Sequence, residues 1–153
     1  MSRPLASVKR CQTVRVYIDK LEFEGELLMI KLKTVVLETN DISALCSFYS
    51  ELLGWPIVFQ VETFIRIQSP QNDTGIAFQL DEDYIPPKWP TEKNEQQMMA
   101  HLDLGVADKV EMDKAIEKAF QLGASISETQ YGNGEWVTFL DPAGHPFCFV
   151  IWS

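Results

Sequence analysis

The stretch "HLDLGVAD", residues 101–108, decides the fold because an earlier stretch, "TVVLETND" at residues 34–41, has the same form. In each stretch apolar residues alternate with other residues, as in a strand with one buried face, and each ends in an aspartate that can cap a following helix. A helical pattern follows each aspartate and stops at Leu-Gly, as "ISALCSFYSELLG" after Asp41 and as "KVEMDKAIEKAFQLG" after Asp108. This repetition indicates that the chain contains one structural unit twice.

Three short strand-like segments follow each helical pattern. They read "PIVFQVE", "FIRIQS" and "GIAFQL" in the first unit, and "SISETQ", "EWVTFLD" and "PFCFVIW" in the second. Neither unit can bury the face of its sheet alone. The sequence therefore predicts an α+β fold, in which two βαβββ modules pair into a cup-shaped eight-stranded mixed sheet with the helices on its outer face.

The repeat also divides the chain. Module one covers residues 31–80, a linker covers 81–97, and module two covers 98–153, so that the domain spans 31–153. Three prolines in the linker preclude regular structure, although one or both of its Tyr84 and Trp89 should pack rather than stay in water. Residues 1–30 are interpreted as an N-terminal extension outside the native core, and Met1 and Met29 both stay open as the native start.

Composition restricts the classes of partner. The 153 residues suit one globular domain, and the formal net charge of −9, without a Lys/Arg cluster, disfavours nucleic acid and anionic membrane surfaces. Cys11, Cys46 and Cys148 do not form a disulfide framework, which favours the cytoplasm. No apolar run approaches the roughly 20 residues of a membrane span.

Strand alternation assigns the side chains to two faces, unless a β-bulge shifts a strand by one residue. The apolar set should lie under the helices, and it consists of Val35, Leu37, Ile65, Ile67, Ile76, Phe78, Leu102, Leu104, Val106, Phe147, Phe149 and Ile151. The opposite set should line the cup, and it consists of Thr34, Val36, Glu38, Phe64, Arg66, Gln79, His101, Asp103, Trp136, Thr138, Cys148 and Trp152. This mixture of polar groups and aromatics predicts a small-molecule pocket.

The repeated strands, the "SFYSELLGW" and "AFQLGA" helix ends and the "VTFLDPAGHPFCFV" hairpin resemble the glyoxalase/bleomycin-resistance/dioxygenase superfamily. This superfamily is also called the vicinal oxygen chelate superfamily. The resemblance is strongest to its uncharacterised glyoxalase-like branch and runs from about Lys31 to the end. It implies the paired-module fold and a homodimer. The motifs are specific for fold and much less so for reaction.

In the metal-dependent members, the resemblance implies one ion held by a His or Glu on each module's first strand and a carboxylate on each module's last strand. The matching positions here are Thr34, Gln79 or its neighbour Ala77, His101 and Cys148. Only His101 agrees, so we predict no metal and no other cofactor. The alternative is an irregular His/Asp/Glu set formed by His101, Asp103 and Glu38.

Each polar candidate also has an ordinary structural interpretation. His101 is either a general base oriented by Asp103 or Glu38, or a position retained for the fold. Arg66 either holds a ligand carboxylate or forms a surface ion pair with Glu62 or Asp73. For Cys148, the strand "PFCFV" favours a buried, inert thiol, and "DPAG" at 141–144 is a hairpin turn.

We therefore expect a metal-independent small-molecule-binding protein, similar to the bleomycin resistance proteins, whose ligand is anionic or oxygen-rich. The alternative is a lyase or isomerase of the glyoxalase type that uses His101 and Asp103 for acid–base chemistry. The expected ligand-binding residues are Thr34, Glu38, Arg66, Gln79, Trp136 and Cys148.

Overall fold

A computed structural model describes residues 30–152 of the chain. Cys11 and nearly all of the expected N-terminal extension lie outside this part. Residues from Leu32 onward form one compact unit. Its first module contains β1 (Thr34–Thr39), α2 (Ile42–Leu53), β2 (Ile57–Val61), β3 (Phe64–Gln68) and β4 (Gly75–Leu80). Its second contains β5 (Leu102–Val106), α3 (Lys109–Gln121), β6 (Ser125–Ile126), β7 (Trp136–Leu140) and β8 (Pro146–Ile151).

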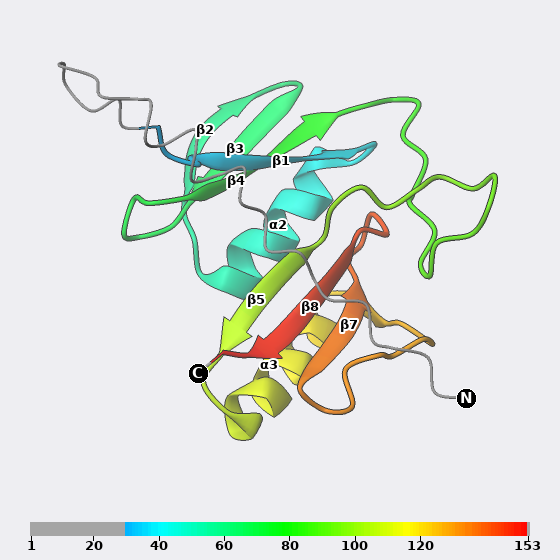
Figure 1. The fold of residues 1–153 in the computed structure, drawn as a ribbon. Coiled ribbons are helices and arrows are strands. Elements are labelled where there is room, and N and C mark those ends of the chain that lie inside the picture. The colour runs from blue at the N-terminus through cyan, green and yellow to red at the C-terminus, as the bar shows by residue number, and fades with distance from the viewer. Residues whose placement is uncertain (1–29, 153) are drawn as a thin grey trace, which may run out of the picture. The chain divides into compact units, whose positions relative to one another are not determined.

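The two modules have the same topology, which confirms the predicted α+β repeat. The strand order is β1-β4-β3-β2 in the first sheet and β5-β8-β7-β6 in the second (Figure 1). In each sheet the first and last strands of the module are parallel and the remaining pairs are antiparallel. The eight predicted strands therefore form two four-stranded mixed sheets, and within residues 30–152 no ladder joins one sheet to the other.

The aspartates that close the repeated motif cap the helices as predicted. Asp41 Oδ1 accepts a hydrogen bond from Ala44 N at 2.9 Å, and Asp108 Oδ1 accepts one from Glu111 N at 2.9 Å. Each bond satisfies a backbone donor that the first helical turn leaves free. At the other end of α2, Gly54 has φ +68°, a left-handed conformation that glycine adopts without strain.

One strand is shorter than predicted. The segment 125–130 forms a two-residue strand, β6; beyond it Ser127 N still donates to Thr138 O at 3.0 Å, and the side chain of Gln130 adds further bonds to β7. Gln130 Nε2 donates to Thr138 O at 2.8 Å, and Gln130 Oε1 accepts from Thr138 N at 2.9 Å. The Gln130 amide thus provides an acceptor for Thr138 N and a second donor to Thr138 O.

A single core joins the helix sides of both sheets. The Tyr49 ring of α2 stacks on Phe78 of β4 at 5.8 Å, and Phe48 and Tyr49 both contact the ring of Phe147 on β8. Figure 1 shows α2 between the first sheet and β5. The residues predicted to lie under the helices belong to this core or pack against it, apart from Val35. Both helix sides therefore point inward, and the opposite faces of the two sheets point away from the core.

A buried hydrogen-bond network connects the modules and the linker. The Asp141 carboxylate accepts bonds from Tyr49 Oη at 3.0 Å, from Ala143 N at 2.9 Å and from His145 N at 3.0 Å. It also lies 3.0 Å from His145 Nδ1, and His145 Nε2 lies 3.0 Å from Tyr84 Oη of the linker. The "DPAGH" turn is therefore a junction between α2, the second sheet and the linker, in addition to a hairpin.

The linker contains no helix or named strand, as its prolines predicted, but both of its aromatic residues pack. Tyr84 lies against His145 with ring centroids 5.4 Å apart, and Trp89 lies against Tyr131 at 6.1 Å. The backbone pairs Lys88 N with Gln96 O at 2.9 Å. The linker is thus an ordered surface segment. No helix in the described part of the chain is long and apolar enough to cross a membrane.

Candidate functional site

The open side of the second sheet forms a depression of about 360 Å³. We call it the second-module face, and it is lined by His101, which directly precedes β5, and by the strand residues Asp103, Trp136, Thr138, Cys148 and Val150. Five of these six were predicted from strand alternation. Trp89 of the linker and Tyr131 of the β6–β7 connection complete the lining. Sequence reasoning missed these two as site residues, although an aromatic residue in a proline-rich linker was a usable signal.

His101 and Asp103 form a pair at the rim of the second-module face. His101 Nε2 lies 3.3 Å from Asp103 Oδ1, and the two side chains are 40% and 47% exposed. Asp103 is therefore the carboxylate that can orient this imidazole. Glu38, the other predicted partner, lines a different depression within the same chain. The pair has the composition and the solvent access that acid–base work requires.

Cys148 has the properties of a protected thiol. The residue is buried, and its Sγ lies 3.4 Å from Thr138 Oγ1. Burial raises the pKa of the Cys148 thiol, with the nearby Asp103 charge acting in the same direction. A thiol that retains its proton is a poor nucleophile, so the predicted inert role is supported by both geometry and electrostatics.

The metal site that the resemblance implies does not fit this chain. Two of its four positions hold Thr34 and Gln79, whose hydroxyl and neutral amide are weak ligands for a divalent ion. The residues that do converge are His101, Asp103 and Cys148, with ligand atoms within 4.8 Å of one another. Within one chain Glu38 is not among these converging residues, and the His/Asp/Glu alternative stays a prediction. A thiol with a raised pKa replaces the expected carboxylate, and it must lose its proton before it can bind an ion.

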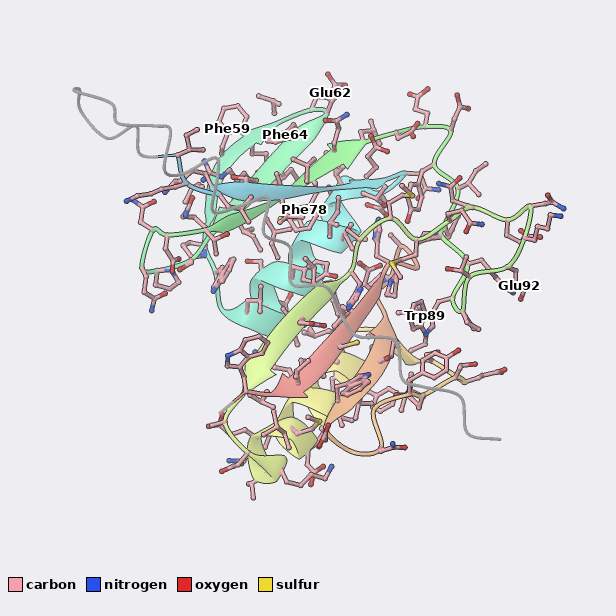
Figure 2. All side chains as sticks on the ribbon, in the orientation of Figure 1. Phe59, Glu62, Phe64, Phe78, Trp89 and Glu92 are labelled. Carbon is pink, nitrogen blue, oxygen red and sulfur yellow. The ribbon has the colours of Figure 1, made fainter. Side chains whose placement is uncertain are left out.

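The open side of the first sheet forms another depression, of about 620 Å³. We call it the first-module face, and it is lined by Thr34, Val36, Val58, Phe59, Phe64, Arg66, Gln68 and Asn72. A register shift between Ile57 and Phe59 places Val58 and Phe59 on one side of β2. Figure 2 shows Phe59 and Phe64 on the side of this sheet opposite Phe78. Val58 and Phe59 are 52% and 51% exposed, so the face presents apolar surface.

Arg66 is held in the first-module face without a counter-charge. Its Nη2 donates to Gln68 Oε1, and Gln68 Nε2 donates in turn to Thr74 O at 2.6 Å. Within residues 30–152 Arg66 forms no ion pair, and its buried Nε has no hydrogen-bond partner. The predicted alternative, an ion pair with Glu62 or Asp73, is therefore not present. Gly75 leaves room for this side chain, because a Cβ there would lie 3.2 Å from Arg66 Nε.

A third depression, of about 430 Å³, receives the two remaining predicted residues. Glu38 and Gln79 lie there with Tyr84 and His145. Burial is the main factor that raises the pKa of the Tyr84 hydroxyl, and the Asp141 and Glu38 charges raise it further. Strand alternation thus assigned these side chains to the correct sheet face. Within one chain, however, the predicted cup residues are distributed over three depressions, two of which share Val36. Trp152, also predicted in the cup, lines none of the three and is 72% exposed.

Comparisons with known proteins agree with this fold. A family model described as a glyoxalase-like domain matches residues 34–150. No curated protein matches the chain. A glyoxalase/bleomycin resistance protein/dioxygenase family enzyme from Burkholderia phytofirmans PsJN is 20% identical, covers 78% of this chain and 97% of its own, and has a TM-score of 0.61.

Two further solved structures show how widely function varies on this fold. Lactoylglutathione lyase from Agrobacterium tumefaciens is 16% identical to this chain. The match covers 80% of this chain and 94% of the lyase, with a TM-score of 0.56. The fosfomycin resistance protein FosX from Mesorhizobium loti is 12% identical to this chain. The match covers 83% of this chain and 95% of FosX, with a TM-score of 0.60. Identities this low establish the fold alone. Because the family model spans both modules, the chain belongs to the glyoxalase-like domain family.

Proposed function

We propose that this protein is a metal-independent small-molecule-binding protein, and that it holds an anionic or oxygen-rich ligand in a cup shared by two copies of the chain. Arg66 carries the proposal. A guanidinium without a counter-charge, in a depression with apolar and amide walls, is suited to a bidentate carboxylate or a comparable oxygen pair. We place this activity in the cytoplasm, since the described cysteines, Cys46 and Cys148, are free and buried.

A second copy of the chain is the occupant that best fits the two open faces. The first-module face exposes Val58 and Phe59 beside Arg66, and the second-module face combines Trp136 with the acidic Asp103. Apolar and aromatic side chains therefore meet when the first-module face of one copy covers the second-module face of the other, and Arg66 and Asp103 line opposite sides of the cup with the ligand between them. A twofold axis makes this contact twice and produces two equal cups.

The ligand proposal is tested by a thermal-shift screen of small carboxylates, oxygen-rich metabolites and aromatic antibiotics. A ligand specific for the folded state raises the melting temperature in proportion to its affinity and concentration. Arg66→Gln should weaken binding of any hit by about ten- to a hundred-fold, the effect of losing one charge-assisted hydrogen bond. Lys109→Gln removes an equal charge from an exposed pair on α3 and should change nothing. Equal affinity of both variants would remove Arg66 from the site.

The dimer is tested by light scattering at tens of micromolar protein. Phe59→Asp places a charge in the proposed interface and should yield monomer. Val110→Asp makes the same kind of change at a 61% exposed position on α3 and should remain a dimer. A monomeric wild type, or dimers in both variants, would show that the open faces are not the contact.

The alternative function is a lyase or isomerase in which His101, oriented by Asp103, moves a proton on the ligand. The 3.3 Å contact between these side chains favours it. Such an enzyme should exchange an acidic C–H of its ligand with deuterium from solvent, and His101→Gln should abolish this exchange. Metal analysis of untagged protein completes the test, because near-stoichiometric metal that is lost in His101→Ala would refute metal independence.

A further inference from the structure

The second-module face has the chemistry of a site for a positively charged group. Three aromatic side chains, Trp89, Tyr131 and Trp136, line one depression with the Asp103 carboxylate. No Lys or Arg lines this depression in the described part of the chain. Aromatic rings present negative potential at their faces, and a carboxylate adds a full negative charge. This environment attracts a cation and repels an anion.

The three aromatic residues come from three different segments, and two of them form a corner. The rings of Trp89 and Tyr131 are 6.1 Å apart and inclined at 82°, so they provide two nearly perpendicular walls. Trp136 stands on β7, and Figure 2 shows Trp89 beside the second sheet. The linker holds Trp89 in place through the bond from Lys88 N to Gln96 O at 2.9 Å. The walls are therefore present before any ligand arrives.

The charge of Asp103 is available to a ligand. Its side chain is 47% exposed. Among the described residues, the one basic side chain in contact with it is His101. The net charge of −9 on the whole chain adds a field that favours the approach of cations.

We propose that the second-module face binds a cationic group, a quaternary or protonated amine, between the Asp103 carboxylate and the rings of Trp89, Tyr131 and Trp136. This inference deepens the proposed function and rests on it for one point, that the two open faces meet in a shared cup. The ligand of that cup then carries charge at both ends, with oxygens toward Arg66 and a cationic end toward Asp103. A cavity of about 360 Å³ accommodates a trimethylammonium group with its neighbouring carbons.

The test compares choline with 3,3-dimethylbutan-1-ol, which has the same shape but no charge, by titration calorimetry on the full chain. Choline should bind at least about ten-fold more tightly, because cation–π and carboxylate attraction act on the charged compound alone. Asp103→Asn should weaken choline binding by about five-fold or more without affecting the neutral compound. Asp113→Asn removes an exposed carboxylate from α3 and should leave both affinities unchanged.

A second variant tests the aromatic wall without disturbing the core. Tyr131 is 56% exposed, so Tyr131→Leu should fold normally, as a melting curve will verify, and should lower the affinity for choline. Equal affinity for the two compounds, no binding of choline, or unchanged affinity in Asp103→Asn would each overturn the inference. If an anionic ligand still depends on Arg66 in that case, the proposed function survives. Choline binding without any Arg66-dependent ligand would instead support the cation site and refute the proposed role of Arg66.

Discussion

Tyr49 allows a direct test of the network that connects the two modules. Its ring is fully buried, and its hydroxyl donates to Asp141 Oδ2 at 3.0 Å. Tyr49→Phe removes this bond and keeps the ring that stacks on Phe78 and contacts Phe147. A hydrogen bond to a charged group contributes about 1.5 to 3 kcal/mol. Because Asp141 retains three other donors, we expect a loss near the lower end, about 2 kcal/mol.

Thermal unfolding followed by circular dichroism measures this loss. For a domain of this size, about 2 kcal/mol corresponds to a fall in melting temperature of roughly 8 °C. Tyr131→Phe is the matched control, since that hydroxyl has no hydrogen-bond partner in the described residues and its side chain is 56% exposed. The control should stay within about 0.5 kcal/mol of wild type. If Tyr49→Phe melts together with the control, the Tyr49–Asp141 bond does not join the modules.

Three more measurements test individual contacts of the fold. Burial, followed by the Asp141 charge, raises the pKa of Tyr49, so the folded state keeps a proton that the unfolded state releases near pH 10. The contribution of Tyr49 to the free energy of unfolding should therefore be present in full below pH 10. Above pH 10 the free energy of unfolding should fall by up to about 1.4 kcal/mol per pH unit, and it should fall less steeply in Tyr49→Phe. Urea titrations at pH 9 to 11 measure this difference. Gln130→Ala leaves the Thr138 N–H without an acceptor, while Thr138 O keeps its bond from Ser127 N, and should cost about 1 to 3 kcal/mol and speed exchange of the Thr138 amide. Gly75→Ala places a Cβ 2.7 Å from Ile67 O and should lower stability by about 1 to 3 kcal/mol, whereas an unchanged melting temperature would mean that β3 and β4 adjust freely.

Local sequence signals were sufficient for the elements and for their faces. An aspartate before each helical pattern and Leu-Gly after it located both helices, because caps depend on a few adjacent residues. Alternation placed His101, Asp103 and Cys148 together because side chains on one strand, or on paired strands, share a face by geometry. Which side chains share a face is therefore determined by the strand pairing within a single sheet.

The arrangement of the two sheets could not be derived in this way. Alternation shows which residues share a face, but it does not show which face meets which. That choice is made by contacts between distant segments, such as Tyr49 with Phe147 and Tyr49 with Asp141. For the same reason Arg66 and His101, predicted in one cup, occupy separate depressions of the chain. Tyr131 escaped notice because its role depends on Trp89, about 40 positions earlier in the sequence.

The separation of the open faces has a consequence for how binding would be controlled. Each face alone is open to solvent, and an ion pair on it contributes little because water screens it. When one face covers the other, Arg66 and the Asp103–His101 pair enter a region of lower dielectric, where the same charges interact more strongly with a ligand. A ligand that contacts both faces then stabilises the dimer by the same free energy by which the dimer stabilises the bound ligand. In this protein, binding and association would therefore be a single linked equilibrium.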